Sequence, residues 1–213
     1  MKRTLVKICG MTRAEDARLC AALGADMLGF IFHLGSPRNV DPAFPASLDS
    51  RADLLGALKV GVFVGQSASE VRDIMQAGGL DLAQLHGGQD EAFCQQVGAA
   101  RVIKVLWPEK AVSTEVLQTE IDRFAPHCRL FLADAGSGGG GHGRTIESDR
   151  LAAVRFPNPW LLAGGLTPEN AAGMLRRYTP SGLDINSGVE SAPGIKDATK
   201  LRAAFDAIRA AKL

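Results

Sequence analysis

Short apolar segments alternate with helical segments along most of this 213-residue chain, and that alternation limits the folds it can adopt. Segments such as 28–32 and 60–64 are apolar at consecutive positions, which is typical of strands buried on both faces of a parallel sheet. β-branched and Leu-rich runs bounded by turn residues predict eight strands. These strands cover residues 4–9, 27–33, 59–64, 82–86, 101–107, 129–134, 160–163 and 183–185.

Helical periodicity fills most of the intervals between the strands. Thr12 with Glu15 and Ser67 with Glu70 have the spacing of a capping box, and Thr167 is followed by a proline that suits a first helical position. The segment 44–58 gives no clear assignment. The predicted helices cover residues 13–23, 67–77, 91–97, 113–124, 147–154, 168–178 and 197–211.

Eight strand–helix units in 213 residues leave about 26 residues for each unit, close to the lower limit for a closed eight-stranded barrel. We therefore predict a single α/β domain over residues 1–213, folded as a (β/α)8 barrel of the TIM type. The alternative is an open, doubly wound sheet, which would need only five or six of the predicted strands.

The composition excludes several classes of protein. Hydrophobic residues make up 46% of the chain, enough for a full core, and 24 basic residues face 23 acidic ones. A chain so balanced predicts no nucleic-acid partner. Every apolar run is shorter than the ~18 residues that cross a bilayer, and no signal sequence precedes the first strand, so we expect a cytoplasmic protein without membrane contact. The dispersed histidines and cysteines predict neither a metal site nor disulfides.

Polar residues follow the predicted strands, at the end of a barrel where catalytic groups lie. Gly164 and Gly165 follow the seventh strand, and Asn186, Ser187 and Gly188 follow the eighth. Backbone N–H groups in such glycine-rich turns can bind a phosphate. The same glycines would also serve as tight turns, and the sequence alone does not separate the two interpretations.

Four further side chains at strand ends have both a chemical and a structural interpretation. Cys9 is either an inert core residue or a general base whose pKa is lowered near Lys7. Asp134 is either a helix cap or a buried acid. The planar guanidinium of Arg38 can bind a carboxylate through two N–H groups, but an arginine in a Pro-flanked loop is usually just solvated. His86 is interpreted as a hydrogen-bonded structural histidine rather than a catalyst.

A glycine run at 138–143 satisfies a dinucleotide-binding pattern and comes close to a nucleotide-binding P-loop, with Arg144 where lysine is required. Neither pattern is complete, because no acidic residue follows at the spacing that a dinucleotide site needs. A glycine-hinged lid over a substrate is the better interpretation of this loop. A non-catalytic phosphate- or nucleotide-binding module is kept as an alternative function.

Four motifs, in order and each at a strand end, give the chain a family resemblance. They are Lys7–Thr12 (KICGMT), Ser36–Val40 (SPRNV), Gln84–Gly87 (QLHG) and Asp184–Glu190 (DINSGVE). Together they resemble the phosphoribosylanthranilate isomerase family of tryptophan biosynthesis, from the first strand to the last helix.

The resemblance implies an isomerase without metal or cofactor, acting as a monomer or homodimer on a small phosphorylated substrate. The implied reaction is the Amadori rearrangement of N-(5′-phosphoribosyl)anthranilate to 1-(o-carboxyphenylamino)-1-deoxyribulose 5-phosphate by acid–base catalysis. By resemblance, Cys9 is the general base, Asp134 the general acid, and Arg38 the ligand of the substrate carboxylate. The resemblance also places the remaining substrate-binding positions at His86, Asp184, Gly164, Gly165, Asn186, Ser187 and Gly188.

The chain departs from the family pattern at three places, one of which is the segment Thr145–Glu147 after the lid, where the family has a pair of aromatic residues. His142 replaces the usual threonine of the glycine-rich lid, and Asn186 stands where serine is frequent. A second isomerase of the same fold, from histidine biosynthesis, catalyses the same rearrangement and is an alternative. It has an acidic residue in the first strand, where this chain has Cys9, and two similar halves, which this chain lacks.

Overall fold

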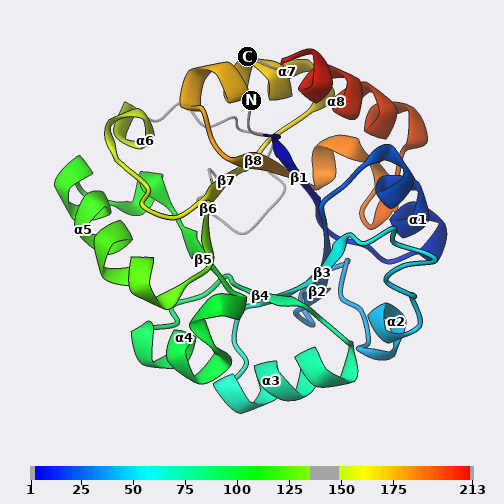
Figure 1. Ribbon diagram of the computed structural model, residues 1–213, viewed down its shortest axis with the longest axis horizontal. Helices are drawn as coiled ribbons and strands as arrows, with labels where there is room; N and C mark the ends of the chain where they lie inside the picture. The colour runs from blue at the N-terminus through cyan, green and yellow to red at the C-terminus, as the bar shows by residue number, and fades with distance from the viewer. Residues whose placement is uncertain (1–2, 135–148, 212–213) are drawn as a thin grey trace.

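The computed structural model describes residues 3–134 and 149–211, and these form a closed barrel of eight parallel strands surrounded by helices (Figure 1). The eight barrel strands are β1 (Leu5–Ile8), β2 (Met27–Phe32), β3 (Leu58–Phe63), β4 (Leu82–Leu85), β5 (Val102–Leu106), β6 (Leu130–Asp134), β7 (Trp160–Ala163) and β8 (Gly182–Ile185). A two-stranded antiparallel hairpin of β9 (Glu190–Ala192) and β10 (Ile195–Lys196) follows β8.

Helices cover the outside of the barrel and separate consecutive strands (Figure 1). The α-helices are α1 (Ala14–Leu23), α2 (Ala43–Ala46), α3 (Ala68–Ala77), α4 (Glu91–Val97), α5 (Thr114–Phe124), α6 (Asp149–Ala153), α7 (Pro168–Tyr178) and α8 (Ala198–Ala210). The described residues also contain four single 3-10 turns: η1 (Ala99–Arg101), η2 (Pro108–Lys110), η3 (Ala125–His127) and η4 (Ser187–Val189). No helix in these described parts is long and apolar enough to cross a membrane.

Pairing between the first and last strands closes the ring. Lys7 of β1 lies in register with Met27 of β2 on one side and with Asp184 of β8 on the other. All eight neighbouring pairs are parallel, and strand order follows chain order. The predicted barrel is therefore confirmed, and the open doubly wound sheet is wrong because such a sheet has two unpaired edges.

Two apolar layers hold the barrel together, as the alternation of side chains along a strand requires. Inward-facing residues such as Val60, Ile103 and Leu161 fill the barrel, and all three are fully buried. Outward-facing residues such as Phe30 and Phe131 pack against the helices in a second, larger cluster. Strands with both faces apolar are thus explained by burial on both sides.

Helix starts agree with the sequence in part. Ser67 caps α3 through a reciprocal capping box with Glu70. Thr12 does not cap α1: the helix begins one residue later than a Thr12 cap requires, and the Thr12 hydroxyl donates to the carbonyl of Gly194. That bond spans 182 positions, so tertiary structure overrides the local capping pattern. In the unassigned segment 44–58, the end of α2 is followed by turns and bends, and Leu58 begins β3.

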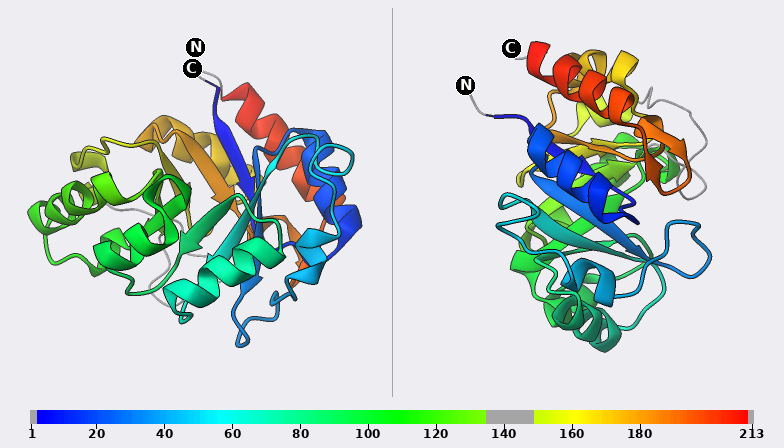
Figure 2. Two further views of the ribbon diagram at one scale, coloured as in Figure 1. Left: turned by 60° about the horizontal axis from the view of Figure 1, so that its bottom comes forward. Right: turned by 90° about the vertical axis from the view of Figure 1, so that its right-hand side faces the viewer.

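The loop between β2 and α2 and the β9–β10 hairpin project from the same end of the barrel (Figure 2). This is the end at which the parallel strands finish, so residues far apart in the chain meet there. The hairpin and the 3-10 turn η4 are elements that the sequence did not predict. The glycine run 138–143, His142 and Arg144 lie outside the described residues.

Candidate active site

One cleft opens at the carboxyl ends of the barrel strands, and all eight strands or the residues just after them contribute to its lining. This position agrees with the rule that catalytic groups of such barrels lie at that end. Nine of the ten residues predicted for the site line this cleft: Cys9, Arg38, His86, Asp134, Gly164, Gly165, Asp184, Asn186 and Ser187.

Cys9 lies directly after β1, where its thiol is buried beside an ion pair. The Lys7 ammonium, completely buried, donates to Asp184 Oδ2 at 2.8 Å. Burial raises the pKa of Cys9 by more than the Lys7 ammonium lowers it, so the pKa of the thiol lies above its usual value. Burial also disfavours the charged form of Lys7, but Asp184 and the sulfur of Cys9 leave its pKa raised.

Gly29 of β2 makes the space that the Cys9 side chain occupies. A Cβ atom at Gly29 would lie 2.6 Å from Cys9 Sγ, closer than real Cβ atoms approach other atoms, and 3.1 Å from Cys9 Cα. The glycine in this otherwise apolar strand is therefore a condition for the position of the thiol.

Asp134 ends β6 and is buried next to His86, which follows β4. The imidazole Nε2 lies 3.5 Å from Asp134 Oδ2, and its Nδ1 lies 3.3 Å from the amide nitrogen of Gln84. Burial lowers the pKa of His86, so the ring is neutral at physiological pH. With Nδ1 accepting from Gln84, the ring proton is on Nε2 and faces the Asp134 carboxyl. His86 thus combines its predicted structural role with contact to the candidate acid.

Two acceptor atoms at the cleft have no hydrogen-bond partner among the described residues: Asp184 Oδ1 and Gln84 Oε1, both buried. Unsatisfied buried polar atoms are rare in proteins and costly to keep. A bound molecule that presents hydroxyl donors would satisfy both. Gln84 was noted in the QLHG motif but was not predicted as a site residue.

Gly164 and Gly165 follow β7 with φ angles of 98° and 60°. Both values fall in the left-handed region that glycine adopts freely, and consecutive N–H groups in such a turn make a concave anion-binding surface. Ser187 reaches the cleft from the neighbouring turn η4.

Gly188 is the one predicted site residue that does not line the cleft, so its assignment as a direct ligand is not supported. A Cβ atom there would lie 1.9 Å from the carbonyl oxygen of Leu166. Glycine at this position lets the turn after β8 approach the turn after β7. Its contribution is to the distance between the two halves of the candidate phosphate site.

Arg38 reaches the cleft from the loop after β2, with its side chain only 12% exposed. Its Nη2 donates to Glu190 Oε2 at 2.6 Å, so the guanidinium is held by a carboxylate of this chain. Lys196 donates to the other oxygen of Glu190 at 2.8 Å. No sequence pattern predicts this cluster, because Arg38 and Glu190 are 152 positions apart.

An apolar and aromatic wall completes the lining. Ile31 belongs to β2 and Val62 to β3, while Val64 directly follows β3 and Trp107 follows β5. The Lys110 ammonium lies 4.3 Å from the centre of the Trp107 ring. A planar aromatic ligand fits such a wall. Within residues 3–134 and 149–211, no three His, Cys, Asp or Glu side chains gather as a metal site.

Fold and cleft together define an α/β-barrel enzyme with a buried thiol, a buried carboxyl group and a glycine turn in one active-site cleft. The family model of N-(5′-phosphoribosyl)anthranilate (PRA) isomerase matches residues 6–207. The N-(5′-phosphoribosyl)anthranilate isomerase of Maridesulfovibrio salexigens is 57% identical over 204 residues, which are 96% of this chain and 98% of that protein.

Solved structures agree with the sequence comparisons. Phosphoribosyl anthranilate isomerase from Thermus thermophilus superposes with a TM-score of 0.80 at 35% identity, over 97% of this chain and 99% of that one. A second isomerase, solved in complex with reduced 1-(o-carboxyphenylamino)-1-deoxyribulose 5-phosphate, superposes with a TM-score of 0.77 at 25% identity, over the same shares. The chain belongs to the N-(5′-phosphoribosyl)anthranilate isomerase family.

Its activity is the Amadori rearrangement of N-(5′-phosphoribosyl)anthranilate in tryptophan biosynthesis. The match over almost the whole chain decides against the two alternatives raised by the sequence, the histidine-pathway isomerase and the non-catalytic binding module.

Proposed function

We propose that Cys9 is the general base and Asp134 the general acid of this isomerisation. The observation that carries the proposal is that both groups, buried at the ends of β1 and β6, line the same cleft. A proton donor and a proton acceptor in one water-poor site supply the two proton transfers that the reaction needs.

In the proposed sequence, Asp134 gives its proton to the furanose ring oxygen, and the C1–O bond breaks to leave a protonated Schiff base at C1. The Cys9 thiolate then takes the proton from C2, and the electron pair of that bond neutralises the iminium to give an enolamine. Transfer of the enol proton to C1 completes the ketone. Apart from the C1–O cleavage that opens the ring, the steps transfer only protons, and the molecule undergoes no net oxidation or reduction.

The raised pKa of Cys9 suits a base of this kind. A thiolate with a raised pKa is scarcer but binds a proton more strongly, which matters because a C–H proton is weakly acidic. The buried Lys7 ammonium supplies the positive charge that a thiolate needs in an apolar site.

The substrate has groups that match the rest of the cleft. We assign its carboxylate to Arg38 and its phosphate to the turns at Gly164, Gly165 and Ser187, with Asn186 beside them. The reduced ribulose compound bound by the related isomerase has the same carboxylate, hydroxyl and phosphate groups, which supports the assignment.

We assign the sugar hydroxyls to the two unpartnered acceptors on Asp184 and Gln84, and contact with the reacting sugar to His86. Hydroxyl donors would satisfy both buried oxygen atoms at once. We assign Gly188 to the close packing of the two phosphate turns, because a Cβ atom there would lie 1.9 Å from the Leu166 carbonyl oxygen.

Loss of the fluorescence of freshly prepared N-(5′-phosphoribosyl)anthranilate tests the catalytic roles. Cys9→Ala and Asp134→Asn should each lower kcat by about 10²-fold or more with little change in KM. Matched controls are Cys20→Ala, a buried thiol in α1, and Asp122→Asn, an exposed acid in α5, and both should keep wild-type kcat. Wild-type turnover by either cleft variant, verified as folded by circular dichroism, would refute the assignment.

We further propose that residues 1–213 act as one domain, in the cytoplasm, as a monomer or homodimer. The β1–β8 pairing supports one domain, because no part of the ring closes without both ends of the chain. Free thiols at all four cysteines suit a reducing compartment. Cell fractionation, light scattering and a single unfolding transition test these points.

A further inference from the structure

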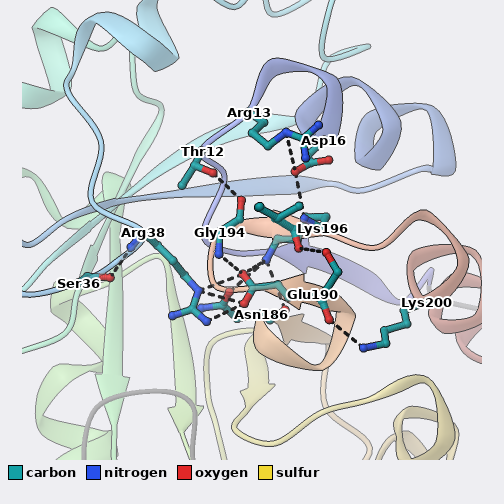
Figure 3. Close-up of polar contacts among 12 residues, drawn as sticks. Thr12, Arg13, Asp16, Ser36, Arg38, Asn186, Glu190, Gly194, Lys196 and Lys200 are labelled. Atoms are coloured by element: carbon teal, nitrogen blue, oxygen red, sulfur yellow. Dashed lines mark hydrogen bonds and ion pairs between the residues drawn. The ribbon is translucent and has the colours of Figure 1, made fainter.

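The substrate-binding Arg38 is itself bound by a cluster that no sequence motif connects to it. Its Nε donates to Glu190 Oε1 at 3.0 Å and its Nη2 to Oε2 at 2.6 Å, a two-point contact with one carboxylate. The side chains of Arg38 and Glu190 are 12% and 4% exposed, respectively. Figure 3 shows Arg38 extending to Glu190 beside Asn186.

This contact uses only one edge of the guanidinium. A guanidinium binds a carboxylate in two-point fashion either through Nε and Nη2 or through Nη1 and Nη2. Glu190 occupies the first edge. Among the described residues, Nη1 makes no hydrogen bond, so the second edge remains for another carboxylate.

Lys196 completes the cluster and sets its charge. Its fully buried ammonium donates to Glu190 Oε1 at 2.8 Å and to Asn186 Oδ1 at 3.1 Å. Burial raises the pKa of Glu190, but the hydrogen bonds from Arg38 and Lys196 outweigh it, and the carboxylate stays ionised. Two cations and one anion leave one net positive charge beside the cleft. Without Lys196, the pair of Arg38 and Glu190 would be neutral.

Packing fixes the aliphatic part of the Arg38 side chain, and hydrogen bonds fix its guanidinium. Gly10, with φ of 77°, has room for no side chain: a Cβ atom would lie 2.7 Å from Arg38 Cδ and 2.7 Å from Asn186 Oδ1. The hairpin that holds Glu190 is tied to helix α1 through Asp16, whose carboxylate accepts from the backbone N–H of Lys196 at 3.0 Å. Asp16 in turn lies 4.0 Å from Arg13 Nε. The arginine is thus set in place before any ligand arrives.

We propose that Glu190 and Lys196 are positioning residues for substrate recognition. Glu190 holds the side edge of Arg38 so that the Nη1–Nη2 edge is presented to the substrate carboxylate, and Lys196 cancels the charge of Glu190 so that Arg38 keeps its attraction for an anion. The inference rests on the proposed role of Arg38, which the same experiment tests separately.

Recognition of the carboxylate is measured by calorimetric Kd values for two ligands. One is reduced 1-(o-carboxyphenylamino)-1-deoxyribulose 5-phosphate, and the other is the same compound without the carboxyl group. Their ratio isolates recognition of the carboxylate. In Arg38→Met, Glu190→Gln and Lys196→Met, the preference for the carboxylate-bearing ligand should fall by roughly tenfold or more, through weaker binding of that ligand alone. The kcat of Glu190→Gln should stay within about threefold of wild type, while KM rises.

Lys200→Met is the matched control. Lys200 donates to the backbone carbonyl of Glu190 at 2.8 Å, so it anchors the same hairpin without touching the carboxylate. Its variant should keep the wild-type ligand preference. In the double variant Arg38→Met/Glu190→Gln, the second substitution should have no further effect on the preference, since Glu190 acts through Arg38.

The outcomes separate the two levels of inference. Should Arg38→Met retain the preference, the assignment of Arg38 to the carboxylate is wrong. Should Arg38→Met lose it while Glu190→Gln and Lys196→Met retain it, or should Lys200→Met lose it equally, the cluster is only a structural support and the positioning role is overturned. If Glu190→Gln does not fold, the preference of Lys196→Met decides.

Discussion

Single residues without functional groups decide where the reactive ones lie in this site. Gly29 contributes no atom to catalysis, yet a methyl group there would overlap the Cys9 sulfur at 2.6 Å. The Cys9 side chain cannot move away from such a methyl group, because it is buried between β1, β2 and the Lys7–Asp184 pair. The position of the Cys9 thiol therefore depends on the lack of a side chain at Gly29.

Gly29→Ala should lower kcat by about 10²-fold, because a displacement of about 1 Å at a reacting group has effects of that size. Overpacking should also cost about 1–3 kcal/mol in the free energy of unfolding. Steady-state kinetics and urea unfolding measure the two effects.

Gly61→Ala is the control, since its methyl group would overlap Phe63 at 2.6 Å in the outer layer, away from the cleft. It should lose stability and keep kcat. Equal losses of kcat in both variants would show that the effect is general to overpacked strands.

The residues at strand ends could be predicted from sequence because barrel topology brings them together whatever their separation in the chain. Nine predicted residues meet in one cleft for this reason. The environment of Cys9 could not be predicted, since the net effect of burial and of Lys7 on its pKa depends on distances. The pairing of Arg38 with Glu190 was equally hidden, because no local pattern relates residues from separate loops.

At the scale of elements, the turns after β7 and β8 form one unit. Gly188 in η4 brings its turn against the Leu166 carbonyl, and the adjacent Ser187 faces the same cleft as Gly164 and Gly165. The sequence predicted glycine-rich turns here but could not separate ligand binding from turn formation. In the structure, Gly164 and Gly165 line the cleft, whereas Gly188 permits close packing of the two turns.

Gly188→Ala should push the two turns apart and weaken phosphate binding. We expect KM for the substrate, and the inhibition constant of inorganic phosphate, to rise about tenfold or more, since displaced donors lose charge-assisted hydrogen bonds. Gly173→Ala in α7 is the control, because a Cβ atom there meets nothing within 4 Å.

The control variant should gain about 0.5–1 kcal/mol of stability from better helix propensity, with unchanged KM. An unchanged phosphate inhibition constant in Gly188→Ala would mean that the turns tolerate separation and that the phosphate lies elsewhere.

At the scale of the whole molecule, closure of the ring explains which features could be predicted from sequence. The order of strands and helices could be predicted, but the contacts between the first and last units could not. Alternating periodicity is local, so the eight strands are visible in sequence. The Thr12–Gly194 contact and the β9–β10 hairpin depend on the first and last units meeting. Closure also buries thiols between barrel and helices, and this gives the stability of the protein a dependence on alkaline pH.

Cys20 of α1 is fully buried, and burial raises its pKa from 9.0 to about 12. The folded protein then binds a proton that the unfolded chain releases above pH 9, so this contribution to stability is complete below pH 9 and is lost as pH rises towards 12. At about pH 10.5 the loss is about 2 kcal/mol relative to pH 8. Cys20→Ala should lack this loss. Urea unfolding at pH 8 and pH 10.5 measures it: the unfolding free energy of the variant should fall by about 2 kcal/mol less than that of wild type. Between pH 7 and 8 the difference in unfolding free energy between wild type and Cys20→Ala should stay constant. If this difference also stayed constant up to pH 10.5, the thiol would ionise as readily in the folded protein as in the unfolded chain.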